Sequence, residues 1–317
     1  MRINRRRIAS IVGLLQAGAV VTAVFSIATI FDHLHRYLEL FSHFRLQYLF
    51  ASMVLAIILV TLRKFNYAVL MIVIAIVNSV PVVPWYMGTS MTTANIESRF
   101  TVLLANVQSE NDDHQSLATL VENEQPDIVF LQEIHEGWAG TLTVLAEDYP
   151  YSRIVPRNDN FGIAVMSRRP IDSVDVMDSP PLGLPTLVAR ITIQDSQLTF
   201  VSTHPMNPIG KMAYDARNEQ LADISRHVSA LAGPVVLIGD LNTSMWASHY
   251  RKLEADTRLR NARVGFGIFP SWPTFLPFAM IPIDHCLVSD AIGVVDFRRG
   301  PDIGSDHLPL VVTLELL

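Results

Sequence analysis

The N-terminal third of the chain contains three long runs of residues that carry no charge. They cover residues 8–31, 46–62 and 65–86. A helix that crosses a bilayer needs about 20 mostly apolar residues, and none of these runs shows the polar face of a helix on a soluble domain. We therefore predict a membrane module over residues 1–87, with helices at about residues 8–31, 45–62 and 65–87. A buried hairpin formed by the second and third runs is the alternative.

The first run is longer than the roughly 7–15 apolar residues of a signal peptide, and further runs follow it, so we expect it to be retained. Basic residues then indicate the orientation. Four arginines precede the first run, and Arg63 and Lys64 lie between the second and the third. Basic loops stay in the cytoplasm. Three spans would therefore place the N-terminus inside and the rest of the chain outside, as in a bacterial inner-membrane protein with a periplasmic domain.

The two parts of the chain differ in charge. Before residue 97 there are eight basic and two acidic residues, a net charge of +6; because the whole chain carries −6, the remainder carries −12. Neutralising the phosphates of a nucleic acid takes Lys and Arg, so nucleic acid is an allowed but not a favoured partner. Cys286 is the single cysteine, which excludes a disulfide framework and a cysteine-based zinc site. A metal must be held by oxygen and histidine ligands.

Residues 88–98, which are small and polar, are expected to form a linker. From residue 99 to 317, short apolar runs alternate with turn residues and with two amphipathic stretches, 115–123 and 214–231. The runs have the β-branched and aromatic content of strands; they cover residues 100–105, 127–131, 161–167, 187–193, 198–202, 235–238, 284–288 and 310–314. This pattern predicts an α/β domain in which two packed β-sheets are flanked by helices.

Polar side chains that can bind metal or move protons lie at the ends of these predicted strands. They are Asn106, Glu133, His204, Asp240, Asn242, Asp284, His285, Asp306 and His307. Each alone can be explained as a turn, a cap or a solvated strand end. Burying so many polar groups without partners is costly, so we expect them to meet at one edge of the sandwich and form a site.

In this order, the segments around these residues resemble the endonuclease/exonuclease/phosphatase family. The family includes DNase I, apurinic endonucleases, inositol polyphosphate phosphatases and neutral sphingomyelinases. The resemblance covers about residues 100–317 and is carried by Asn106, Gln132-Glu133, Phe161-Gly162-Ile163-Ala164, Thr203-His204, Gly239-Asp240-Leu241-Asn242, Ile283-Asp284-His285 and Ser305-Asp306-His307. It implies a DNase I-like sandwich and metal-dependent hydrolysis of phosphate esters.

The resemblance also implies a metal site. Glu133 is similar to the main Mg²⁺ ligand, with Asn106 beside it, and Asp306 is similar to a residue in or next to the metal site. Hard oxygen ligands suit Mg²⁺, with Mn²⁺ as a possible substitute. Some nuclease members carry an acidic residue where this chain has Gln108, which favours one main metal.

The remaining roles follow from the same resemblance. Asp240 is expected to orient or deprotonate the attacking water, and Asn242 to hold a phosphate oxygen. His204 is expected to contact the phosphate or donate a proton. His307 would stabilise developing negative charge while paired with Asp284. Apart from the resemblance, Arg217 follows a flexible stretch and lies at the start of a helix-like segment. It is expected either to contact the substrate phosphate or to be a solvated helix residue, and Asn160 is a further candidate for a substrate contact.

The function expected from these residues is hydrolysis of a phosphodiester or phosphomonoester at the outer membrane face. Residues 268–283 are apolar and rich in proline, so they either pack on the sandwich or dip into the bilayer, which would suit membrane lipids as partners and lipid headgroups as substrate. A membrane-tethered nuclease is the alternative, and a non-catalytic binding module on the same fold is a second one. The oligomeric state is left open.

Overall fold

A computed structural model describes residues 5–88 and 96–317. The chain forms two compact units. The N-terminal unit holds the residues up to 85 together with 246–248, and the second unit holds 86–245 with 249–317. Of the expected linker, residues 89–95 lie outside the described part of the chain, and Ile96–Ser98 form a 3-10 turn, η3.

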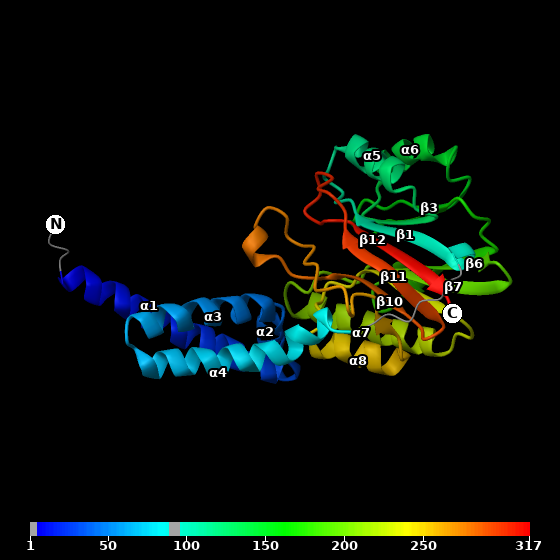
Figure 1. The fold of residues 1–317 in the computed structure, drawn as a ribbon. Helices are drawn as coiled ribbons and strands as arrows, with labels where there is room; N and C mark the ends of the chain where they lie inside the picture. Colours follow the sequence, from blue (N-terminus) through cyan, green and yellow to red (C-terminus); the bar gives the residue numbers. More distant parts are fainter. Residues whose placement is uncertain (1–4, 89–95) are drawn as a thin grey trace. The chain divides into compact units, whose positions relative to one another are not determined.

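The N-terminal unit is helical (Figure 1). Its elements are α1 (Arg5–Ala28), η1 (Thr29–Leu34), α2 (Arg36–Ser42), α3 (Arg45–Thr61), α4 (Phe65–Val82) and η2 (Val83–Tyr86). Small side chains, among them Ala19, Ala56 and Ala68, are buried where α1, α3 and α4 pack, as is usual for helices that associate inside a membrane. Asn78 of α4 also donates to the Ser26 hydroxyl of α1 at 2.6 Å.

Two of the three expected transmembrane helices are long and apolar enough to cross a membrane. These candidate spans cover Ser10–Leu34 and Phe65–Tyr86. The expected span at 45–62 needs correction. It forms α3, whose 17 residues reach only about 26 Å at 1.5 Å per residue, short of the roughly 30 Å hydrocarbon core. A third span results only if α2 and α3, bent by 60° at their junction, are counted as one.

The second unit consists of two mixed six-stranded sheets (Figure 1). The first has the order β11-β12-β1-β2-β4-β3 and the second β5-β6-β7-β8-β10-β9. Within them, β1 runs parallel to β2 and β7 parallel to β8. The strands are β1 (Arg99–Asn106), β2 (Ile128–Gln132), β3 (Tyr151–Val155), β4 (Ile163–Ser167), β5 (Ser173–Ser179), β6 (Leu184–Ile193), β7 (Ser196–Thr203), β8 (Val235–Asp240), β9 (Arg260–Asn261), β10 (Asp284–Val288), β11 (Ile292–Arg299) and β12 (Leu310–Leu316).

The main core lies between the two sheets, where Phe130 of β2 packs against Phe200 of β7. Helices cover the outer faces: α5 and α6 lie over the first sheet, and α7 and α8 lie over the second (Figure 1). The helical elements are α5 (His114–Glu124), α6 (Glu136–Leu142), η4 (Thr143–Ala146), α7 (Lys211–Ser229), α8 (Ser248–Thr257) and η5 (Pro277–Ala279). The expected fold, two packed sheets flanked by helices, is confirmed.

Candidate active site

The strand ends bring the expected polar residues to one edge of the sandwich. The first sheet contributes Asn106 at the end of β1 and Glu133 directly after β2, because these parallel strands pair Asn106 with Gln132. The second sheet contributes Asp240, which lies opposite Asp284 in the β8–β10 register. His204 follows β7, and Asp306 and His307 precede β12. Both sheets are therefore needed to build the site.

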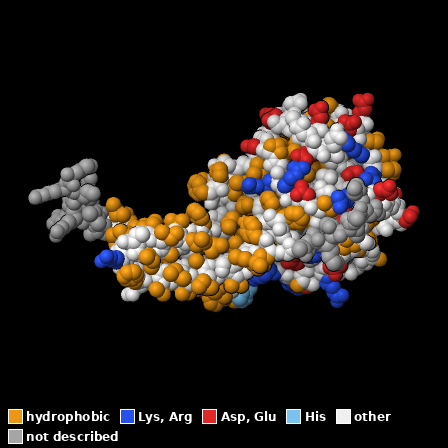
Figure 2. All heavy atoms as spheres, in the orientation of Figure 1, with side chains coloured by type: hydrophobic (Ala, Val, Ile, Leu, Met, Phe, Trp, Pro, Cys, Tyr) orange, Lys and Arg blue, Asp and Glu red, His pale blue; other side chains and the backbone are white. Residues whose placement is uncertain are grey.

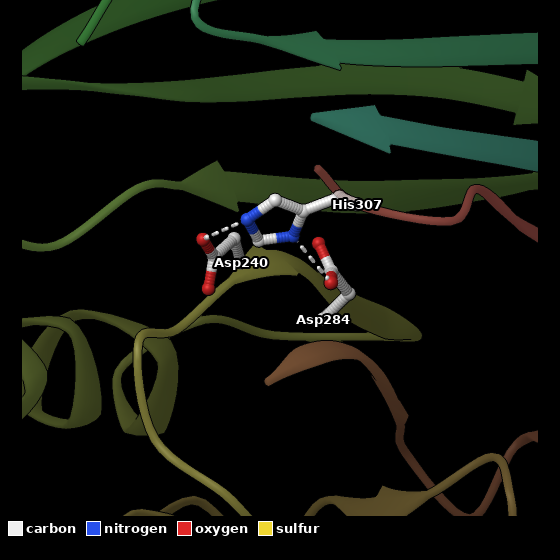
Figure 3. A group of neighbouring side chains, drawn as sticks. All are labelled: Asp240, Asp284 and His307. Atoms are coloured by element: carbon white, nitrogen blue, oxygen red, sulfur yellow. Dashed lines mark hydrogen bonds and ion pairs between the residues drawn. The ribbon is translucent and has the colours of Figure 1, made fainter. Parts of the chain in front are cut away.

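His307 lies between two aspartates (Figure 3). Its Nδ1 donates to Asp284 Oδ2 at 2.9 Å, and its Nε2 lies 3.7 Å from Asp240 Oδ2. All three residues are buried. Burial alone disfavours a charged imidazole, yet the charges of Asp284 and Asp240 and the hydrogen bond to Asp284 raise the pKa of His307 to about 10. The same pairing outweighs burial at Asp284 and lowers its pKa. His307 is thus held as a cation at neutral pH.

His204 approaches the same carboxylate from another direction. Its Nε2 lies 3.5 Å from Asp240 Oδ2 and 3.3 Å from Asn242 Nδ2. Burial opposes its protonation, but the hydrogen bond and charge of Asp240 raise the pKa of His204 above its ordinary value. Asn242 is fixed by its backbone N–H, which donates to Asp240 Oδ1 at 2.8 Å. Two imidazoles and one amide thus surround a single carboxylate.

Glu133 forms the other half of the site. Asn106 Nδ2 donates to Glu133 Oε1 at 2.9 Å, and Ser109 N donates to Oε2 at 3.1 Å. Because Asn106 Oδ1 accepts from Gln108 N, its NH₂ group faces the carboxylates Glu133 and Asp240. Asn106 therefore stands as a donor that holds Glu133, and its expected role as a metal ligand stays a prediction. The positive φ of Glu133, 65°, is a strained conformation of the kind found at functional sites.

The acidic groups of this half fit a divalent cation. Glu133 and Asp306 are partly exposed. Gln108 connects the two sides of this half, since its side chain accepts from Asp306 N and its backbone N–H donates to Asn106 Oδ1. Over residues 5–88 and 96–317, no Lys or Arg forms an ion pair with Glu133, Asp240 or Asp306. Carboxylate oxygens are the donors that Mg²⁺ prefers.

A second donor set is Asp240, Asp284 and His307, whose potential ligand atoms lie within 4.8 Å of one another. The His307–Asp284 hydrogen bond already uses one nitrogen and one carboxylate of this set. We therefore regard the group as a hydrogen-bonded arrangement, and Glu133 with Asp306 as the better place for a cation.

Gln132 connects the two halves. Its Nε2 donates to Thr203 O at 2.8 Å, and its Oε1 accepts from Asp240 N at 2.7 Å. The side chain is fully buried and reaches from the first sheet into the second. Gly239 allows this approach, because a Cβ there would lie 2.1 Å from Thr203 O and 2.6 Å from Gln132 Nε2. One amide thus sets the position of β8 relative to Glu133.

The other expected residues are placed differently. Arg217 is buried, and its Nη1 donates to Asn242 O at 2.9 Å, so it supports the Asn242 loop; this position does not favour the expected contact with substrate. Asn160 is exposed in the loop before β4, next to Phe161, whose ring lies 5.3 Å from that of His204. His285 points away from the reacting groups: its Nε2 donates to Thr243 O at 2.8 Å, and its Nδ1 lies 3.0 Å from Arg263 Nη1.

Several supporting residues were not found from the sequence. Ser109 holds Glu133, Trp272 donates to Asp306 Oδ2 at 2.8 Å, and Arg263 donates to the backbone carbonyl of Asp284. None lies at the end of a predicted strand. The sequence did contain an indication of Trp272, because it is the single tryptophan in the apolar segment 268–283.

A model of the Endonuclease/Exonuclease/phosphatase family matches residues 93–307 of the sequence. The chain belongs to this family. Endonuclease/exonuclease/phosphatase members hydrolyse phosphoric esters and are typically dependent on a divalent metal, so this chain is a phosphoric ester hydrolase. The sequence matches none of the curated proteins.

Solved structures show the same family fold. D. rerio TDP2, complexed with single strand DNA product, is 18% identical with a TM-score of 0.59, over 69% of this chain and 99% of that chain. An endonuclease/exonuclease/phosphatase from Beutenbergia cavernae is 21% identical with a TM-score of 0.56, over 69% and 72%. Sphingomyelinase C from Streptomyces griseocarneus is 17% identical with a TM-score of 0.52, over 68% and 99%.

Proposed function

We propose that this chain is anchored in a membrane and hydrolyses a phosphoester in the headgroup of a membrane lipid, with Mg²⁺ or Mn²⁺ bound at Glu133. The main support for a lipid substrate is that the charge-free segment 264–283 is attached to the site. Trp272, in the middle of that segment, donates to Asp306 Oδ2 at 2.8 Å. An apolar surface joined directly to an acidic phosphoesterase site suits a substrate that is part apolar and part phosphate.

The metal site in this proposal comprises Glu133, with Asn106 and Asp306 beside it. A divalent cation bound there would neutralise charge on the phosphate and polarise it. Asp240 would take the proton of the attacking water, since it is the carboxylate on which groups from both sheets converge. The developing charge on phosphorus-bound oxygens would be stabilised by His307, which Asp284 holds in its charged form.

The leaving group needs a proton, and His204 is placed to give one. Burial opposes its protonation, but Asp240 raises its pKa, which favours the protonated form that a general acid needs. Asn242 Nδ2 donates to Pro205 O at 3.0 Å and lies beside His204. This keeps an amide donor where a phosphate oxygen would contact His204.

Charge favours lipid over nucleic acid as the substrate class. The part of the chain after residue 96 carries a net charge of −12, which repels a polyanion at low salt. The similarity to sphingomyelinase C is consistent with a lipid substrate. DNA is the second candidate, because TDP2 with a bound single strand DNA product has the same fold.

The proposed location is a bacterial inner membrane, with the N-terminus in the cytoplasm and the catalytic unit outside. The two candidate spans and the bent pair α2–α3 support membrane anchoring. The arginines before the first run and the Arg63–Lys64 turn support the orientation.

The test uses the full chain, purified in detergent and reconstituted with Mg²⁺. Release of headgroup from sphingomyelin and from glycerophospholipids is compared with nicking of plasmid DNA and with turnover of a small soluble phosphodiester. Asp240→Ala removes the proposed proton acceptor, and Asp195→Ala, at an exposed turn, is the matched control. Headgroup release that is lost with EDTA and in Asp240→Ala, but kept in Asp195→Ala, supports the proposal. DNA nicking with the same dependence, without lipid turnover, would replace the lipid by the nuclease function.

A further inference from the structure

The segment 270–283, here called the lip, projects from the sandwich (Figure 1). Its base is closed by an antiparallel bridge between Trp272 and Ile281, and its tip is the short 3-10 helix η5. From residue 264 to residue 283 the chain carries no charged side chain. Phe275 is 74% exposed and Phe278 is 78% exposed. Hydrophobic side chains gather at the position of this loop in Figure 2.

Large aromatic side chains at such exposure indicate a surface that binds another molecule or a membrane, because apolar area in water is unfavourable. The lip presents no charged or hydrogen-bonding side chain at its tip with which to recognise a protein or a nucleic acid. Aromatic and aliphatic side chains without charge are the composition that enters the interfacial region of a bilayer.

The tether to the N-terminal unit brings a bilayer within reach. Between the candidate span that ends at Tyr86 and the first residue of β1, Arg99, lie the twelve residues 87–98. Even fully extended, twelve residues span only about 40 Å. In the proposed membrane-anchored protein, so short a connection would keep the catalytic unit close to the bilayer.

The base of the lip is bonded to the active site. In addition to the Trp272 bond, Thr274 N donates to Asp306 O at 3.0 Å, and Thr274 Oγ1 donates to Ser305 O at 3.0 Å. On the other side, Ser271 Oγ accepts from Asp284 N at 3.4 Å. The segment that carries the exposed phenylalanines therefore also positions residues 305–306, next to His307.

We infer that the lip inserts Phe275 and Phe278 into the membrane surface and that Trp272 links this insertion to the position of Asp306. The inference rests on the proposed function for its substrate, while the insertion itself does not depend on which phosphoester is cleaved. Trp272 is a positioning residue, since it acts through Asp306. Two separable effects follow: the tip determines access to lipid, and the base determines turnover.

Insertion is measured by labelling the lip. Cys286 is buried, so a thiol-reactive NBD label on the full-length Phe278→Cys variant marks the tip alone. The variant is placed in nanodiscs that contain lipids with a spin label near the headgroup. We expect strong quenching and a blue shift for this variant. The control is Val144→Cys in η4, directly after α6, which is 74% exposed and should remain unquenched.

If something other than lipid covers the tip of the lip, the fluorescence of the label will differ. A blue-shifted label that spin-labelled lipid does not quench would mean that protein, such as a second copy of the chain, covers the tip. A label that stays in water would mean that nothing covers it. Either result overturns the insertion.

Coupling is measured by kinetics in the same nanodiscs. Phe275→Ser combined with Phe278→Ser should raise the KM for lipid by about 10-fold or more, since two buried aromatic contacts are lost, and leave turnover of a soluble phosphodiester unchanged. Trp272→Phe keeps the apolar ring and loses the Nε1–H donor, so it should lower kcat on both substrates by about 10-fold with label quenching intact. Unchanged kcat in Trp272→Phe would refute the link. If the wild-type chain cleaves no phosphoester, the proposed function fails while the quenching experiment still reports insertion.

Discussion

At the scale of single residues, the arrangement depends most on a side chain that does no chemistry. Gln132 bonds to the backbone of Thr203 and of Asp240, while its chain neighbour Glu133 carries the carboxylate proposed for the metal. The Gln132 bridge therefore contributes to the spacing between Glu133 and Asp240, which the Asn106 side chain also joins. A displacement of about 1 Å between such groups lowers catalysis by about 100-fold.

We expect Gln132→Met to lower kcat by about 10- to 100-fold with a small change in KM, because both hydrogen bonds are lost while side-chain volume is kept. Steady-state kinetics on the soluble phosphodiester measure this. Gln115→Met, at an exposed position of α5, is the matched control and should behave as wild type. A Gln132→Met enzyme with full kcat would show that the bridge does not position Asp240.

His285 is a second such residue, because its position beside Asp284 in the sequence did not reveal that its side chain points away from the site. Burial, with the nearby charge of Arg263, lowers its pKa to about 3. The folded protein therefore keeps it neutral where an unfolded chain, with an ordinary value of about 6.5, binds a proton. Because the unfolded state binds more protons between these values, stability rises with pH across this window and falls as the pH drops below about 6.5.

The wild-type chain should lose about 1.4 kcal/mol from this residue between about pH 7.5 and pH 5.5. His285→Gln cannot titrate, so its stability should depend less on pH by that amount, whatever its absolute stability. Thermal unfolding of the catalytic unit in the full chain, followed by near-UV circular dichroism, measures both slopes. Equal slopes in the two proteins would contradict a neutral buried His285.

At the scale of the elements, the strands that carry the site were the ones most visible in the sequence. β2, β8 and β10 are buried throughout. β2 and β8 appear as apolar runs that end in a polar residue, and β10 as an apolar run that follows two polar residues. The edge strands β3 and β5 are partly exposed and show no such run. β9 has only two residues, too few to give any periodicity.

The close approach of Gly239 in β8 to the backbone of β7 gives a prediction about this glycine. We expect Gly239→Ala to destabilise the catalytic unit by at least about 3 kcal/mol, because the added Cβ would strike the backbone oxygen of Thr203 at 2.1 Å, which cannot rotate away. Activity should fall with it. Denaturant unfolding measures the loss. The control, Gly140→Ala in α6, meets nothing within 4 Å and should be neutral or slightly stabilising.

The polar residues that cluster in the candidate site could be predicted from the sequence, but the residues that hold them in place could not. Asp240, Asn242 and His307 follow or precede apolar runs, and their order in the chain is that of the family. Trp272 and Arg263 act through contacts between segments that lie far apart in sequence, and such contacts depend on the packing of two sheets. The second run was predicted as one straight helix for a related reason, since the absence of charge does not reveal that α2 and α3 meet at a 60° bend.

At the scale of the whole molecule, the number of spans decides the side on which the catalytic unit acts. Three spans place it opposite the N-terminus, and two spans return it to the same side. We expect an alkaline phosphatase reporter fused after Leu317 to be active in a bacterial host, since this reporter folds only outside the cytoplasm. A reporter fused after Lys64 should be inactive. An inactive reporter after Leu317, with the fusion protein present in the membrane, would favour two spans and a cytoplasmic catalytic unit.

The order of the strands has a further consequence for how such a chain is made. β12 lies in the interior of the first sheet, between β11 and β1, and His307 is supplied just before it, about 200 residues after Asn106. A ribosome that has released every other site residue has still produced a catalytically silent chain. In the proposed topology, the helices would therefore enter the membrane before His307 is made, and the growing chain would cleave no phosphoester during insertion.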